Sequence, residues 1–174
     1  PLGKFTGTAG RFTCDNCAPG KYALNGATAC STCPSGRYSE LGNTGECTLC
    51  AVGHATLAIT NGTRCDPCPA GWFQDTEGQG TCTRCPVGTY SQGGAAQCTP
   101  CAAGTFTNSL AATSCTPCAI GTAALAAKST ACTNCAAGSY SNATGASMCY
   151  ACEEGKFKAA ASAETKGFDP TALL

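Results

Sequence analysis

The chain has 174 residues, of which 18 are cysteine; only 11% are charged, and the formal net charge at pH 7 is zero. Cysteine at about a tenth of the residues is typical of a disulfide scaffold, not of a domain held together by a large apolar core. The sequence lacks the basic patch expected for a nucleic-acid partner or a polybasic membrane contact, and it lacks an apolar span long enough for a transmembrane helix.

Residues 1–13 are expected to be the C-terminal part of a truncated repeat. Pro1-Leu2-Gly3-Lys4-Phe5 matches the second half of a unit that recurs from Cys14 onward, so a cysteine is expected one residue before Pro1. The chain begins with neither an initiator methionine nor a signal peptide, and we interpret it as a segment of a longer protein.

Residues 14–157 are expected to form a tandem array of nine units with the pattern Cys-x-x-Cys-(Pro/Ala/Glu)-x-Gly-x-aromatic. The second cysteines recur every 16 to 18 residues, and a glycine stands three residues after each of them. A short, regular period predicts stacked units instead of a single globular core. The expected fold class is a small disulfide-rich β/loop protein, an elongated ladder of roughly 17-residue repeats with little regular secondary structure.

Each unit is expected to contain two short extended segments joined by a turn, with the fixed glycine supplying a positive φ or a close backbone approach. We expect the aromatic residue after the glycine to pack over a disulfide as a miniature core, in preference to lining a ligand-binding strip. Ala55 and Ala123 replace it in two units, where Leu57 and Leu125 are expected to compensate from the same strand face. The aromatic residues in this position are Phe5, Tyr22, Tyr38, Phe73, Tyr90, Phe106, Tyr140 and Phe157.

Residues 158–174 are expected to be a degenerate repeat, a cap or a linker. The alanine-rich run from Lys158 to Lys166 is the one segment with some helical propensity. No further Cys-x-x-Cys pair follows it, so the repeat pattern lapses here.

Nine Cys-x-x-Cys pairs could supply zinc sites or disulfides. The single histidine is not at a ligand spacing, and nine pairs cannot be divided evenly into four-thiolate sites. The glycosylation sequons at Asn61 and Asn142 have meaning only in a secreted protein, and the small polar spacers resemble solvated loops. We therefore expect disulfides, an extracellular or cell-surface location and glycans on both asparagines, with no metal and no other cofactor.

The spacing of the cysteines and the odd number of pairs leave two disulfide patterns open. In the first, the second cysteine of each pair bonds the first cysteine of the next pair, which closes small rings worth roughly 3 kcal/mol each. The rival pattern joins first to first and second to second. The first pattern uses Cys17, Cys30, Cys33, Cys47, Cys50, Cys65, Cys68, Cys82, Cys85, Cys98, Cys101, Cys115, Cys118, Cys132, Cys135 and Cys149. It leaves Cys14 for an upstream cysteine and Cys152 without a visible partner.

The chain offers little for catalysis, and we expect no catalytic residue and no enzyme activity. His54 lies in a variable position expected to face solvent, and no Ser/His/Asp or Cys/His constellation can be assembled around it. Trp72 is the best candidate contact for a partner, because it adjoins Phe73 and adjacent strand residues point to opposite faces. The simpler expectation for Trp72 is a half-buried ring beside a disulfide.

The unit Cys-Pro-x-Gly-x-(Tyr/Phe) followed by Cys-x-x-Cys, as in residues 33–50, resembles the cysteine-rich repeats of tumour-necrosis-factor receptors and the ephrin-receptor-like repeats. It is also similar to the Cys-x-x-Cys surface proteins of protists, such as ciliate immobilisation antigens. The resemblance runs from residue 1 to about residue 157. It implies a bond from Cys33 to Cys47 and equivalent bonds elsewhere. Tumour-necrosis-factor receptors alternate module types, whereas this chain repeats one unit, so the ephrin-receptor-like and protist arrays resemble it more.

We expect an extracellular structural repeat protein that forms a rod-like part of a filament, a cell-surface coat or a flagellar or ciliary appendage. Its partners would be other protein chains, through self-assembly or through binding to other filament or coat proteins. The alternative is a ligand-binding or adhesion ectodomain of a receptor-like cell-surface protein. A binding repeat should carry a distinctive loop, and only the Trp72 unit hints at one.

Overall fold

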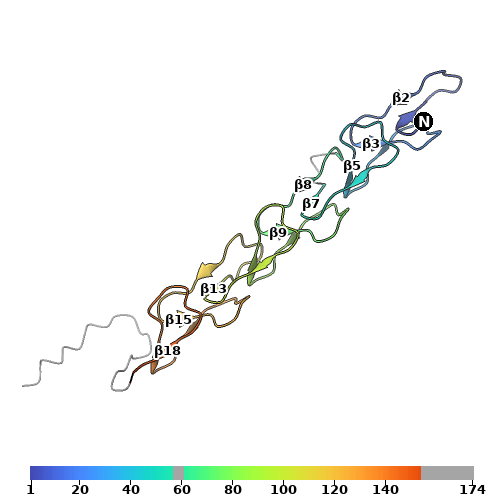
Figure 1. Ribbon diagram of the computed structural model, residues 1–174. Helices are drawn as coiled ribbons and strands as arrows, with labels where there is room; N and C mark the ends of the chain where they lie inside the picture. The colour runs from blue at the N-terminus through green and yellow to red at the C-terminus, as the bar shows by residue number, and fades with distance from the viewer. Residues whose placement is uncertain (57–60, 154–174) are drawn as a thin grey trace, which may run out of the picture. The chain divides into compact units, whose positions relative to one another are not determined.

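The computed structural model describes residues 1–56 and 61–153. These residues contain no helix, and their regular structure consists of strands two residues long (Figure 1). Each odd-numbered strand pairs antiparallel with the even-numbered strand that follows it, from β1–β2 to β17–β18. The strands are β1 (Lys4–Phe5), β2 (Asp15–Asn16), β3 (Lys21–Tyr22), β4 (Ser31–Thr32), β5 (Arg37–Tyr38), β6 (Thr48–Leu49), β7 (His54–Ala55), β8 (Asp66–Pro67), β9 (Trp72–Phe73), β10 (Thr83–Arg84), β11 (Thr89–Tyr90), β12 (Thr99–Pro100), β13 (Thr105–Phe106), β14 (Thr116–Pro117), β15 (Thr122–Ala123), β16 (Thr133–Asn134), β17 (Ser139–Tyr140) and β18 (Tyr150–Ala151).

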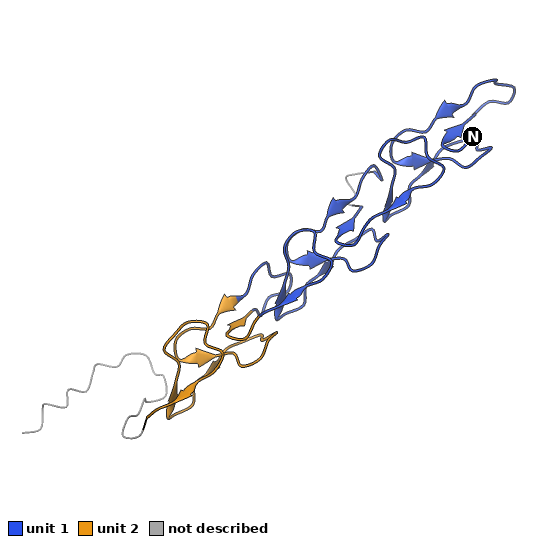
Figure 2. Cartoon of the chain, in the orientation of Figure 1, with its two compact units in different colours: residues 1–101, 107–115 blue, residues 102–106, 116–174 orange. Residues whose placement is uncertain are grey.

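The hairpins fall into two units (Figure 2). Unit 1 comprises residues 1–101 and 107–115 and holds the hairpins from β1–β2 to β11–β12. Unit 2 comprises residues 102–106 and 116–174, and its described part holds β13–β14, β15–β16 and β17–β18. The predicted boundary between residues 157 and 158 lies outside the described residues.

Each hairpin begins at the glycine of one sequence unit and ends in the Cys-x-x-Cys pair of the next. In the hairpin β5–β6, Gly36 has a φ of 82°, and the Arg37 N–H donates to the Pro34 carbonyl at 3.0 Å. The Gly36 carbonyl accepts a hydrogen bond from the Cys50 N–H at 2.9 Å. Because glycine adopts this φ without a Cβ clash, the turn explains why the residue is fixed.

Main-chain hydrogen bonds couple the hairpins of unit 1 to one another. The Gly20 N–H donates to the Ser39 carbonyl at 2.7 Å, which joins one hairpin to the next. The Asn43 N–H donates to the Cys17 carbonyl at 3.1 Å, and this bond passes over the intervening hairpin. Bonds of these two kinds therefore link a hairpin to the next one and to the one after that.

Unit 2 shows the same two kinds of bond. The Gly121 N–H donates to the Ser141 carbonyl at 3.0 Å, and the Gly145 N–H donates to the Cys118 carbonyl at 2.8 Å. The coupling is made mainly by backbone atoms in both units; one exception is the Gly36 N–H, which donates to the Thr56 hydroxyl at 2.7 Å.

The buried core consists of cysteines and small side chains. Cys50, Cys68, Cys85, Cys101 and Cys118 are among the most buried residues, together with Ser91 and Ser141. The Ser91 hydroxyl donates to the Trp72 carbonyl at 2.9 Å, and the Ser141 hydroxyl donates to the Thr122 carbonyl at 3.0 Å. Paired strands, tandem disulfides and the lack of a helix in the described residues confirm the predicted disulfide-rich, loop-dominated fold class.

Two expectations about packing require correction. The aromatic residues after the glycines are half-buried, so the buried core is formed by the disulfides and not by rings; the described members are Phe5, Tyr22, Tyr38, Phe73, Tyr90, Phe106 and Tyr140. Leu125 is 78% exposed and does not compensate for Ala123, because β15 ends at Ala123 and strand alternation stops there. Leu57 and Phe157 lie outside the described residues.

Candidate functional site

The described residues contain eight disulfides of nearly equal span, with Cα–Cα distances from 5.6 to 5.8 Å. They join Cys17–Cys30, Cys33–Cys47, Cys50–Cys65, Cys68–Cys82, Cys85–Cys98, Cys101–Cys115, Cys118–Cys132 and Cys135–Cys149. This connectivity is the first of the two patterns above. Cys14 is exposed and Cys152 is partly exposed, and neither forms a disulfide within the described residues.

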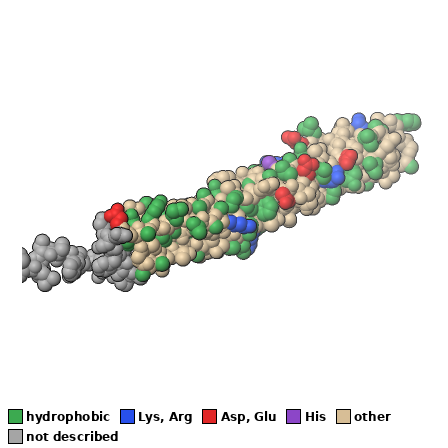
Figure 3. Space-filling model, turned by 60° about the horizontal axis from the view of Figure 1, so that its bottom comes forward, with side chains coloured by type: hydrophobic (Ala, Val, Ile, Leu, Met, Phe, Trp, Pro, Cys, Tyr) green, Lys and Arg blue, Asp and Glu red, His purple; other side chains and the backbone are tan. Residues whose placement is uncertain are grey.

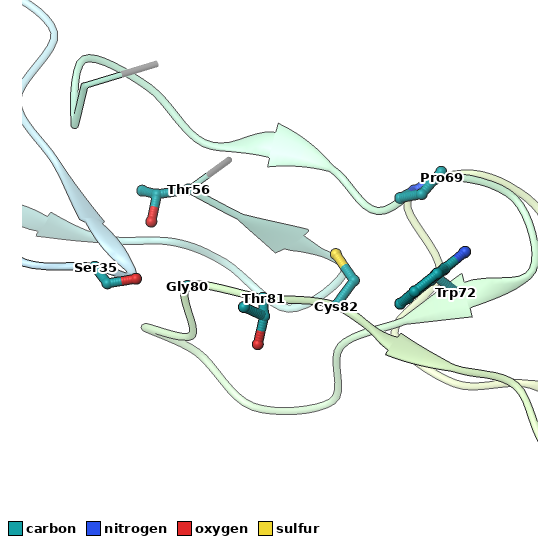
Figure 4. Close-up of a pocket in the computed structure, with 7 residues that line it drawn as sticks. All are labelled: Ser35, Thr56, Pro69, Trp72, Gly80, Thr81 and Cys82. Carbon is teal, nitrogen blue, oxygen red and sulfur yellow. The ribbon is translucent and has the colours of Figure 1, made fainter. Parts of the chain in front are cut away.

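A groove in unit 1 brings together residues from three successive hairpins. We call it the Trp72 groove; it has a volume of about 580 Å³. Its lining residues are Ser35, Thr56, Pro69, Trp72, Gly80, Thr81 and Cys82. Figure 4 shows Pro69 and Trp72 together at one end, Ser35 and Thr56 at the other, and Thr81 and Cys82 between them. None of these side chains is charged, so the groove suits a neutral ligand.

Local contacts hold the Trp72 end of the groove in place. Trp72 on β9 lies opposite Arg84 on β10, and the Arg84 guanidinium carbon is 5.0 Å from the ring centroid. This is a cation–π distance. Gln74 is buried and fixes the connecting loop, because its Nε2 donates to the Thr81 carbonyl at 2.7 Å and its Oε1 accepts from the Thr76 N–H at 3.1 Å. As expected, Trp72 is half-buried and a disulfide cysteine, Cys82, lines the same groove.

A smaller groove of about 190 Å³ adjoins the first. We call it the Asn61 groove, and it is lined by Thr32, Cys33, Pro34, Ser35, Thr56, Asn61 and Gly62. Ser35 and Thr56 line both grooves, so the two grooves adjoin at these side chains. Asn61 and Asn142, the two sequon asparagines, are both exposed.

His54 has no catalytic surroundings in the described structure. Its Nδ1 lies 3.1 Å from the Val52 carbonyl, and the side chain is half-buried. The position it shares with Thr89 is not uniformly solvent-facing, since Thr89 is 5% exposed and its hydroxyl donates to the Pro86 carbonyl at 2.7 Å. Among the described residues, no group of three or more His, Cys, Asp or Glu side chains is arranged to hold a metal ion.

Charged side chains are sparse on the surface. Figure 3 shows single acidic and basic side chains scattered among uncharged and hydrophobic ones on the face in view. Arg37 pairs with Glu46 at 3.1 Å, and Arg64 pairs with Asp66 at 2.9 Å. This surface offers no extended charged patch on which to build a site.

Two segments of the chain, residues 56–90 and 88–124, match the family model described as tyrosine-protein kinase ephrin type A/B receptor-like. No curated protein matches the chain. The match confirms the ephrin-receptor-like resemblance over these two tandem segments, and the first of them includes Pro69, Trp72 and Gly80–Cys82 of the Trp72 groove. Ephrin-receptor-like repeats and eight disulfides together indicate an extracellular or secreted disulfide-rich repeat domain. No helix in the described part of the chain is long and apolar enough to cross a membrane.

Proposed function

We propose that the chain is an extracellular structural repeat protein that forms a rod-like part of a filament, a cell-surface coat or a flagellar or ciliary appendage. One observation carries this proposal: successive hairpins are joined by the same backbone hydrogen bonds while their side chains vary. The Gly20, Gly53 and Gly71 N–H groups each donate to a carbonyl of the following hairpin, at 2.7 to 3.0 Å. Such contacts allow units to be stacked in series without a new interface for each addition.

The composition of the core supports the same role. A chain with little large apolar surface depends on covalent cross-links, and disulfides persist in an oxidising extracellular environment. The proposed role is non-enzymatic and needs no cofactor. The proposed partners are other copies of this chain or other filament and coat proteins, and the exposed Asn61 and Asn142 are the proposed glycan attachment sites.

The second candidate function is a ligand-binding or adhesion ectodomain. The Trp72 groove favours it, because a partly exposed tryptophan in a concave, uncharged site is a common feature of binding surfaces. A ligand bound there would distinguish this function from the structural one.

Electron microscopy of the native, non-reduced protein from its source tests the structural role. We expect filaments or coats that an antibody against this chain labels at regular intervals. Single unassembled chains, labelled without periodicity, would contradict the proposal. A matched Trp72→Ala chain separates the two functions, since assembly through backbone-defined repeats should survive the substitution, whereas adhesion through the Trp72 groove should be lost.

A further inference from the structure

We propose that an N-linked glycan on Asn61 lies along the Trp72 groove and that one of its sugar rings stacks on the Trp72 indole. The proposal rests on passage of the chain through the secretory pathway, which belongs to the proposed extracellular function. It assigns to the Trp72 groove an occupant that is covalently attached in the adjoining Asn61 groove.

The position of Asn61 selects this occupant. Asn61 lines the smaller groove, and that groove shares Ser35 and Thr56 with the Trp72 groove. A glycan that leaves the Asn61 side chain therefore starts in a groove that adjoins the Trp72 groove. Covalent attachment holds the sugar at a high effective concentration, so weak contacts are sufficient to place it there.

The turn that carries Asn61 has a fixed backbone. The Gly62 carbonyl accepts a hydrogen bond from the Ser39 N–H at 2.8 Å, and the Asn61 carbonyl lies so close to Gly20 that a Cβ on Gly20 would collide with it. Asn61 has a φ of 45°, a conformation that asparagine adopts more readily than most residues. The side chain is exposed while the backbone is held, so the direction in which a glycan leaves is restricted.

The chemistry of the lining fits a neutral, hydroxyl-rich ligand with apolar faces. Trp72 offers a flat ring on which sugar C–H groups can stack, and its Nε1–H is a hydrogen-bond donor. Ser35 and Thr81 contribute hydroxyls that no hydrogen bond within the described residues uses. By contrast, a neighbouring groove is lined by Arg37, Glu46 and Glu77, which suits a charged ligand instead.

Asn142 provides an internal control. It is an exposed sequon asparagine in unit 2, and it lines neither the Trp72 groove nor the Asn61 groove. A glycan on Asn142 should therefore project into solvent, so any protection that is seen only at Asn61 reflects the groove.

The test uses the full chain secreted from eukaryotic cells, with site occupancy and enzymatic glycan release followed by mass spectrometry under native, non-reducing conditions. We expect release from Asn61 to be about 3- to 10-fold slower than from Asn142, the factor that a sugar–aromatic stack of ordinary strength provides. Trp72→Ala should abolish the difference, and Trp72→Phe, which keeps a flat ring, should retain most of it.

A second measurement avoids substitution of the groove. Trp72 is the only tryptophan in the chain, so its emission reports on the groove alone. We expect Asn61→Gln to shift the emission maximum and Asn142→Gln to leave it unchanged. Equal release rates at the two sites, or an Asn61 without glycan, would overturn the proposal; a glycan on Asn142 in that case would leave the extracellular assignment standing.

Discussion

The hairpins β9–β10 in unit 1 and β15–β16 in unit 2 have the same backbone and different side chains. Gly71 and Gly121 both have a φ of 84°, and each donates its N–H to a serine carbonyl at 3.0 Å. The strand after the glycine carries Trp72 and Phe73 in one hairpin and Thr122 and Ala123 in the other. The comparison shows that the turn geometry and the disulfides are the same in both hairpins. The two residues after the glycine differ, and in β9–β10 one of them, Trp72, lines a groove.

The largest expected effect concerns the disulfides, which should matter equally in both hairpins. The double variants Cys68→Ser/Cys82→Ser and Cys118→Ser/Cys132→Ser each open a ring with a sequence separation of 14 residues. Each should lower the free energy of unfolding by about 3 kcal/mol, because the unfolded chain regains the entropy of an open loop. Guanidinium unfolding of the non-reduced chains, followed by circular dichroism, measures this. A difference above about 1 kcal/mol between the two would show that side chains contribute to the ring's stability.

A smaller effect should separate the two hairpins. A Cβ on Gly71 would collide with the Ala111 carbonyl oxygen, whereas no described atom lies within 4 Å of a Cβ on Gly121. Gly71→Ala should therefore cost about 2–4 kcal/mol, the sum of a positive-φ penalty and a clash, and Gly121→Ala only about 1–2 kcal/mol.

Gly94→Ala is the control within unit 1 for this pair. Gly94 has a φ of 75°, but its added Cβ would meet only the Pro67 Cβ at 3.6 Å. It should resemble Gly121→Ala in guanidinium unfolding. If Gly71→Ala lost no more stability than Gly94→Ala, that result would contradict the close approach of Gly71 to the Ala111 carbonyl.

The smallest effect should be a gain in both units. Ala111 in unit 1 and Lys128 in unit 2 have φ values of 57° and 64°, which are strained for a residue with a Cβ. Ala111→Gly and Lys128→Gly should each raise the free energy of unfolding by about 0.5–1 kcal/mol, after allowance for the added flexibility of glycine in the unfolded chain. Ala112→Gly, next to the strained position, should instead destabilise; a gain there would contradict the explanation.

The repeat period and the turn glycine were predictable, because both depend on contacts that recur within one sequence unit. The Trp72 groove was only partly predictable. The sequence marks Trp72 as an unusual residue, but Ser35 and Thr56 belong to earlier hairpins, and their approach depends on how the hairpins stack. The depth of the aromatic residues is not predictable from the sequence for a related reason: the buried positions of the repeat are taken by cysteines and small side chains, and the rings are buried only in part.

The disulfide connectivity also determines how the chain would carry a pulling force. From Cys17 to Cys149, S–S bonds alternate with three-residue steps such as Cys30 to Cys33, so tension follows this covalent line and bypasses the hairpin loops. Each disulfide ring has a sequence separation of 13 to 15 residues and a contour length of roughly 40–50 Å. Tension cannot extend this loop while its disulfide is intact. The disulfides therefore limit the length to which tension can extend the chain, and a reducing agent would increase that length in discrete steps, one for each ring opened.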